Sequence, residues 1–83
     1  MYTITDYPKF YYYQNSRLSD RGWVLSRMCR VPTEHQSRVS REYENRYLRG
    51  TRAVGRKAAN TYLQGVAKEF YEQDNKLKQE EKQ

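Results

Sequence analysis

The hydrophobic pattern between residues 33 and 73 changes direction at Gly50, and this change limits the folds open to the chain. Before Gly50 the apolar residues recur every four positions, as on one face of a helix: Val39, Tyr43 and Tyr47. An apolar stripe also follows Gly50. At about 100° per residue on one continuous helix, this second stripe points more than roughly a quarter turn away from the first. A straight helix cannot bury both stripes against one surface. We therefore predict a break near Gly50–Gly55 and a helical hairpin; a single long helix used by two partners is the alternative.

The segment 15–31 predicts a helix ahead of this hairpin. Its apolar face would consist of Leu18, Trp23, Val24, Leu25, Met28 and Cys29. Its cap would be Asn15, Ser16 or Ser19. Val31 ends it, because the residue before a proline is driven out of the helical conformation.

Thr33 is expected to begin the second helix. Thr33 and Gln36 match the capping box, in which the two side chains satisfy each other's backbone N–H groups. His35, in the first turn, would be an exposed helix residue. The second helix is expected to end at Arg49 and Gly50, because a cation in the last turn and a glycine after it are typical of a helix C-terminus.

The third helix is expected over residues 51–73, where the helical period is clearest. Its apolar side would hold Gly55, Ala58, Ala59, Tyr62, Leu63, Val66 and Phe70. Residues 74–83 are polar and predict a tail, as a fraying helix end or a solvated segment. Residues 15–73 would thus form one small, mainly α domain of about three helices.

Residues 1–14 predict an extended, tyrosine-rich arm. Aromatic and β-branched residues favour extended structure, and Pro8 keeps Tyr7 out of a helix. Two uses of the arm stay open. Its rings would pack over the helices as a lid on the core, or Tyr11, Tyr12 and Tyr13 would stack on bases or enter a partner's groove.

The core of such a domain must be thin. Leu, Ile, Val and Phe supply 13 of the 83 residues, whereas there are nine tyrosines and one tryptophan. Aromatic rings bury large areas and can carry a small core. We expect this core to be supported by a partner or by a second copy of the chain in a homodimer.

The net charge of +6 is concentrated in the middle of the chain. Residues 17–57 hold ten arginines and Lys57 against four acidic residues. Arginine forks match the geometry of phosphate and carboxylate groups. This segment predicts a positive face for nucleic acid, a nucleoprotein complex or an acidic protein surface; solubility alone is the alternative.

An arginine stripe sharpens that prediction. On a continuous helix, Arg38, Arg41, Arg49, Arg52 and Arg56 lie within about 60° of one another, with Asn45 on the same row. If the helix breaks at Gly50, the residues before the break stay aligned: Arg38, Arg41, Asn45 and Arg49. Arg52, Arg56 and Lys57 then gather at the start of the third helix. The helix dipole disfavours cations there, so an anionic partner would offset the cost. The predicted binding residues are Arg38, Arg41, Asn45, Arg49, Arg52, Arg56, Lys57, Tyr11, Tyr12 and Tyr13. A solvated face, with Glu34 and Glu42 pairing to neighbouring arginines, is the alternative.

Other classes of function find little support in the sequence. Cys29 is the sole cysteine, which excludes an intrachain disulfide and a cysteine metal cluster and suits a reducing, cytoplasmic setting. No apolar run is long enough for a membrane span. His35 is the one histidine, and no phosphate-binding loop or catalytic motif is present. We therefore expect no enzymatic activity, metal or cofactor.

Three functional hypotheses follow. One is a binder of nucleic acid or nucleoprotein that uses the arginine stripe and the arm. The second is a protein–protein effector, because Arg, Tyr and Trp dominate binding hot spots. The third is a structural oligomer that packs through the small residues of the third helix. In its length, arginine content and lack of catalytic residues the chain resembles small accessory proteins of phages and prophages. That resemblance implies an inhibitor or adaptor that occludes or recruits a larger host complex.

Overall fold

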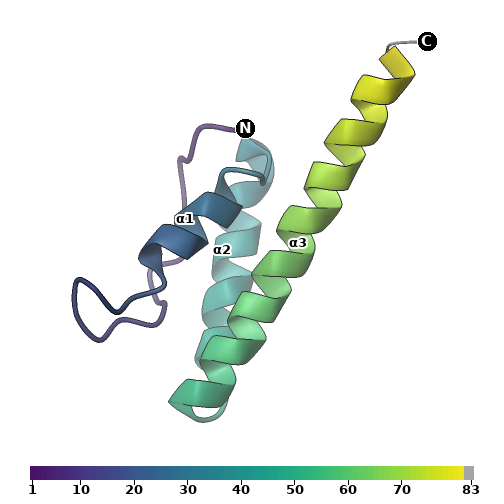
Figure 1. The fold of residues 1–83 in the computed structure, drawn as a ribbon. Helices are drawn as coiled ribbons and strands as arrows, with labels where there is room; N and C mark the ends of the chain where they lie inside the picture. The colour runs from purple at the N-terminus through teal and green to yellow at the C-terminus, as the bar shows by residue number, and fades with distance from the viewer. Residues whose placement is uncertain (82–83) are drawn as a thin grey trace.

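The computed structural model describes the backbone of residues 1–81 and the side chains of residues 1–76. This part of the chain forms three helices, α1 (Arg21–Met28), α2 (Thr33–Tyr47) and α3 (Arg52–Glu81), and no strand. Figure 1 shows α1 and α2 beside the first half of α3, whose second half extends beyond both. The predicted mainly α, three-helix fold is confirmed.

The turn between α2 and α3 forms the predicted helical hairpin. α2 ends at Tyr47, and Gly50 has a φ of 77°, a conformation that glycine adopts without steric cost. Gly55 then allows α3 to pass close to the end of α2, because a Cβ at this position would collide with the carbonyl oxygen of Tyr47. The alternative of one long helix across Gly50 was wrong.

All three helices contribute to a single small core. Its buried residues are Val24, Met28, Val31, Val39, Tyr43, Ala59 and Leu63. The hydroxyl of Tyr43 donates a hydrogen bond to Asn60 Oδ1 at 2.6 Å, which joins α2 to α3. Burial raises the pKa of Tyr43, so this hydroxyl keeps its proton at neutral pH. The core follows the two apolar stripes that the sequence predicts for α2 and α3.

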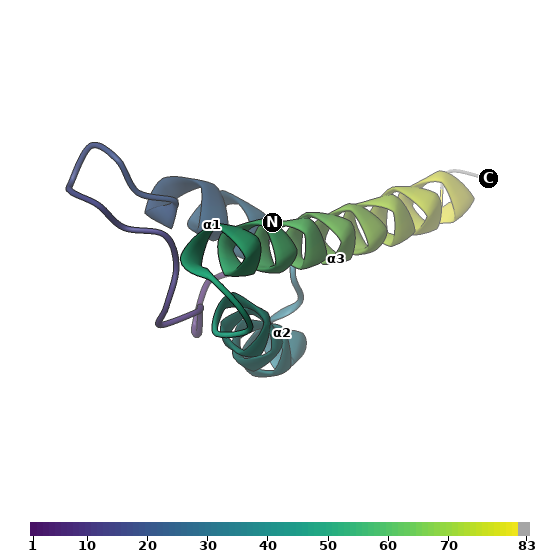
Figure 2. The same cartoon turned by 90° about the horizontal axis from the view of Figure 1, so that it is seen from below.

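The N-terminal arm packs against the helices. Ile4, Tyr7 and Tyr11 lie against the core as partly buried side chains. The backbone N–H of Tyr2 donates to the carbonyl oxygen of Cys29 at 2.7 Å, which fixes the start of the arm at the end of α1. Figure 2 shows the arm running beside α1 and α2, and the hydroxyl of Tyr2 at its start reaches Asp74 of α3. Of the two predicted arrangements of the arm, the structure therefore shows the one in which its side chains pack over the helices and cover the core.

Gln36 holds the arm in place, and this corrects the predicted capping box. Pro32 is the N-cap of α2, Thr33 lies inside the helix, and no side chain caps it. Gln36 is fully buried; its Oε1 accepts from the backbone N–H of Thr5 at 2.8 Å, and its Nε2 donates to the carbonyl oxygen of Thr3 at 2.9 Å. The capping box was wrong because the arm offers Gln36 better partners than the first turn of its own helix.

The first helix is shorter than predicted, since it begins at Arg21 rather than near residue 15. Asn15 Oδ1 accepts from the backbone N–H of Arg17 and of Leu18, both at 2.9 Å. Such side-chain bonds satisfy the backbone in a turn and compete with helix formation. Leu18, predicted for the apolar face, is consequently 53% exposed.

The third helix is longer than predicted and runs to Glu81 rather than ending at residue 73. Residues 74–81 contain neither Gly nor Pro and are mostly good helix formers, so propensity carries the helix onward. His35 was predicted to be exposed, but its ring stacks on Phe70 of α3 with centroids 5.4 Å apart. This contact closes the edge of the core between α2 and α3.

Candidate functional site

The charged groups around α2 largely neutralise one another. Arg41 contacts Asp6 of the arm at 3.0 Å and Glu44 of its own helix at 3.5 Å. Arg46 pairs with Glu42 at 2.9 Å, as the helical spacing predicts. On this side of the molecule, cations and carboxylates are therefore interleaved.

The hairpin divides the predicted arginine stripe between two helices. Arg38 and Asn45 are exposed on α2, and Arg49 is exposed in the turn. Within α2, Arg41 is the residue of the stripe that carboxylates hold. The stripe is thus not a continuous ladder of cations.

Arg52 and Arg56, at the start of α3, turn toward the N-terminal segment. Arg52 Nη2 donates to the carbonyl oxygen of Tyr13 at 2.8 Å. Arg56 donates from Nε and Nη2 to the two carboxylate oxygens of Asp20, both at 2.9 Å. The Arg56 hydrogen bond holds the pKa of Asp20 below its ordinary value, with partial burial opposing it. The two guanidinium groups also lie over the Tyr12 ring, at 5.5 and 3.9 Å from its centroid.

Tyr12 is therefore part of a local cluster, whereas its two neighbours differ. Tyr11 packs against the core. Tyr13 is 55% exposed and forms a single antiparallel bridge with Ser19. The arm does not present three adjacent rings to solvent on one surface.

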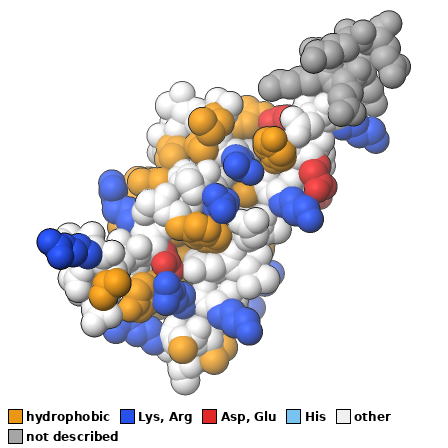
Figure 3. Space-filling view, viewed as in Figure 1, with side chains coloured by type: hydrophobic (Ala, Val, Ile, Leu, Met, Phe, Trp, Pro, Cys, Tyr) orange, Lys and Arg blue, Asp and Glu red, His pale blue; other side chains and the backbone are white. Residues whose placement is uncertain are grey.

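The strongest excess of positive charge lies on the side formed by α1 and the first half of α3. We call this surface the α1–α3 face and define it by Arg17, Arg21, Arg27, Arg30, Arg52, Arg56, Lys57 and Lys68. Asp20 is the only acidic residue in segments 15–32 and 51–68, which carry these cations. Figure 3 shows Lys and Arg side chains spread over this side among hydrophobic ones, with few acidic groups.

Aromatic rings hold several of these arginines in place. The guanidinium of Arg27 lies 5.1 Å from the centroid of Trp23, and that of Arg30 lies 4.8 Å from the centroid of Tyr71. Arg27 Nε also donates to Gln64 Oε1 at 2.7 Å, from α1 to α3. Stacking restrains a guanidinium while leaving N–H groups at its edge to bind an anion. The face therefore presents ordered arginines.

Arg17, Arg21 and Lys68 of this face were absent from the sequence-based site, and so were its two stacked arginines, Arg27 and Arg30. Of these two arginines, the first had a local signal, because Trp23 and Arg27 are one helical turn apart. The second had none: Arg30 is ordered by Tyr71, which lies far along the chain and reaches it only through the packing of α1 on α3.

Lys57, which was predicted, lies between two shallow depressions at the start of α3. One, of about 430 Å³, is lined by Ala53, Arg56, Lys57, Asn60 and Thr61. The other, of about 400 Å³, is lined by Arg46, Val54, Lys57, Ala58, Thr61 and Tyr62. Both are open hollows, so they suit contact with a large partner better than capture of a small molecule.

The described residues form neither a metal site nor a membrane span. No group of three or more His, Cys, Asp or Glu side chains there is arranged to hold a metal ion. No helix in that part of the chain has the length and apolar character needed to cross a bilayer.

Comparisons with known proteins give no match: no family model, no curated protein and no solved structure is detectably similar to this chain.

Proposed function

We propose that this protein is a non-enzymatic binder of nucleic acid, alone or within a nucleoprotein complex, and that the α1–α3 face is its contact surface. The observation that carries the proposal is the concentration of cations on this face. Asp20, which is paired with Arg56, is the only carboxylate in the two segments that supply these cations, although Lys68 also lies 4.0 Å from Glu72, one helical turn further along α3. Cations that neutralise phosphates release counterions, and this release drives association.

The aromatic partners of the arginines support the same proposal. Proteins that bind single strands combine a positive surface with rings on which bases stack. Tyr12, Trp23 and Tyr71 all lie beside an arginine of the face. Arg52, Arg56, Lys57 and Tyr12 from the sequence-based site belong to this surface, and Arg27 and Arg30 join them.

The test is fluorescence anisotropy of labelled single-stranded DNA, duplex DNA and RNA, titrated with the protein at about 50 and 200 mM salt. We expect binding that weakens steeply between the two salt concentrations. Absence of binding to all three at the lower salt concentration would overturn the proposal.

A second candidate, the protein–protein effector, is favoured by one observation at the hairpin turn. Leu48 and Val54 are 64% and 60% exposed, and Val54 lines the hollow beside Arg46 and Lys57. Exposed apolar residues rimmed by cations suit an acidic protein surface. Stoichiometric capture of one acidic protein, lost in Val54→Asp and unaffected by added nucleic acid, would support this function and the phage-type inhibitor or adaptor role.

A further inference from the structure

A small cavity lies where the start of the arm meets the end of α1 and the second half of α3. It has a volume of about 160 Å³ and is lined by Met1, Tyr2, Arg30, Tyr71, Asp74 and Asn75. Pockets for drug-sized ligands measure roughly 300–1,000 Å³. This cavity therefore admits one flat ring of a ligand and leaves the remainder outside.

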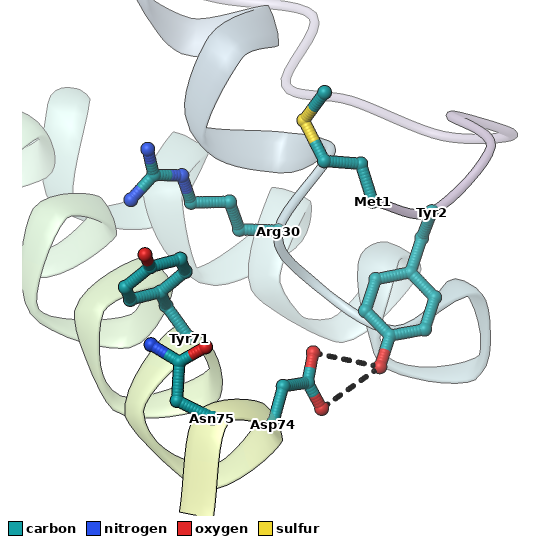
Figure 4. A pocket seen from close by; sticks show the side chains of 6 residues that line it. All are labelled: Met1, Tyr2, Arg30, Tyr71, Asp74 and Asn75. Atoms are coloured by element: carbon teal, nitrogen blue, oxygen red, sulfur yellow. Dashed lines mark hydrogen bonds between the residues drawn. The ribbon is translucent and has the colours of Figure 1, made fainter. Parts of the chain in front are cut away.

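The walls and floor of the cavity have different chemistry. Figure 4 shows Tyr71 on one side and Tyr2 on the other, with Asp74 and Asn75 between them. Tyr71 is 49% exposed, so much of its ring is open to contact. Aromatic walls and a polar floor are what a planar heterocycle requires: surfaces to stack against, and groups that hydrogen-bond to its edge.

The floor is arranged to accept hydrogen bonds. The hydroxyl of Tyr2 donates to both carboxylate oxygens of Asp74, at 3.1 and 3.2 Å. This contact with Asp74 raises the pKa of Tyr2, so the tyrosine keeps its proton and orients the carboxylate. An ionised carboxylate has about four acceptor positions, so positions on Asp74 remain for a ligand's donors. Asn75 adds an amide that both donates and accepts.

The rim of the cavity carries a cation of the α1–α3 face. Arg30 lines the cavity and stacks over Tyr71. A phosphate would be attracted to Arg30 and repelled by Asp74, so the two charges would orient a nucleotide with its base inward and its phosphate on the rim.

We infer that this cavity is a subsite for one unpaired nucleobase that carries an exocyclic amino group, namely cytosine, adenine or guanine. The amino group would donate to Asp74, the ring would contact Tyr71, and the attached phosphate would lie against Arg30. Thymine and uracil have no amino group; their one ring donor at this edge, N3–H, lies between two carbonyl oxygens, which an ionised carboxylate repels. The inference rests on the proposed function and adds to it a preference for single strands and a rule for base selection.

The experiment compares labelled oligonucleotides of deoxycytidine and thymidine, equal in length, by anisotropy at about 50 mM salt. A carboxylate that accepts from a cytosine amino group discriminates by about fivefold to a hundredfold, so the wild-type protein should bind the cytidine strand at least about fivefold more tightly. In Asp74→Asn the ratio of the two affinities should fall to near one, because an amide also donates to the thymine carbonyl. Duplex of either composition should show no preference.

Glu69→Gln is the matched control, because it removes the same charge from an exposed position on α3. It should leave the ratio unchanged, whereas Tyr71→Leu should weaken cytidine binding by about fivefold or more through the loss of stacking. Equal affinity of the wild type for both strands, or an unchanged ratio in Asp74→Asn, would overturn the subsite while nucleic-acid binding itself stands. Failure to bind either strand would overturn the subsite, and the proposed function would fall with it only if duplex DNA and RNA also stay unbound.

Discussion

The guanidinium of Arg56 forms a bidentate ion pair with the carboxylate of Asp20, with both N–O distances at 2.9 Å. Asn60 Nδ2 donates to the same carboxylate at 2.9 Å and thereby adds a second residue of α3. Asp20 is the residue immediately before α1. This pair therefore fixes the beginning of α1 to the beginning of α3.

Replacing Asp20 should destabilise the fold. In Asp20→Asn the guanidinium of Arg56 loses its counter-charge and its strongest hydrogen bonds, at a cost of about 1–3 kcal/mol in the free energy of unfolding. Urea denaturation followed by circular dichroism measures this cost. A denaturation midpoint equal to that of the wild type would show that the pair contributes nothing to stability.

The same pair should make stability depend on acid pH. Arg56 lowers the pKa of Asp20 in the folded protein, so the stabilisation is complete above the ordinary aspartate pKa of about 3.9. It is lost progressively as the pH falls from there through the folded-state pKa. Urea midpoints between about pH 6 and pH 2 should fall more steeply for the wild type than for Asp20→Asn. Parallel curves would contradict this assignment.

Arg56 also shows which part of this ion pair could be predicted from neighbouring residues in the sequence. From its position at the start of a helix we predicted an anionic partner that offsets the dipole; in the structure a carboxylate of the chain itself, Asp20, pairs with it. The sequence could not show that the anion is Asp20, 36 positions earlier, because only the packing of the helices brings the two together. The helical hairpin, in contrast, depended on Gly50 and on short-range periodicity, and it was predicted correctly.

Gln36 provides a test of how the arm is held. Gln36→Ala removes the acceptor for the backbone N–H of Thr5 and of Asp6 and the donor for the carbonyl oxygen of Thr3. Leaving such buried groups unpaired should cost about 2–3 kcal/mol. Amide hydrogen exchange at Thr5 and Asp6 should accelerate along with the loss of stability.

Gln73→Ala is the control for that substitution, because Gln73 is an exposed glutamine on α3. It should change the free energy of unfolding by less than about 0.5 kcal/mol. Equal effects of the two substitutions would mean that the arm is held by its rings and not by Gln36.

The role of Gln36 was missed for an instructive reason. Thr33 and Gln36 have the spacing of a capping box, and that local match hid a long-range use of the glutamine. Arg30 and Tyr71 are a similar case, since neither residue alone indicates a binding surface. Local spacing predicted the helices, whereas the candidate site is built from pairs that meet only in the folded chain.

The two glycines of α3 should respond in opposite ways to alanine. At Gly55 a methyl group would meet the carbonyl oxygen of Tyr47, so Gly55→Ala should force the hairpin apart and cost about 2 kcal/mol or more. At Gly65 no atom other than the adjoining residues and the nearby backbone of its own helix lies within 4 Å of the added carbon. Gly65→Ala should therefore stabilise the helix by about 0.5–1 kcal/mol. Thermal denaturation of both variants measures the difference, and a shift of the same sign in both would contradict the close approach at Gly55.

The position of the positive face can be tested with two double variants of equal charge. Lys57→Gln with Lys68→Gln removes two cations from the α1–α3 face, and Lys9→Gln with Arg38→Gln removes two from the arm and α2. Each lowers the net charge of +6 by two. For single-stranded DNA the logarithmic salt slope changes by roughly 0.7 per phosphate contact, so the first variant should flatten it by about 1.4.

The second double variant should leave that slope nearly unchanged, because its cations lie outside the proposed surface. Anisotropy titrations at several salt concentrations between about 50 and 200 mM give both slopes. Equal flattening in the two variants would show that binding follows the overall charge of the molecule rather than one face. A larger effect of the Lys9 and Arg38 variant would mean that the contact surface is the arginine stripe of α2. In that case Arg41 would have to break its ion pairs with Asp6 and Glu44 when the nucleic acid binds.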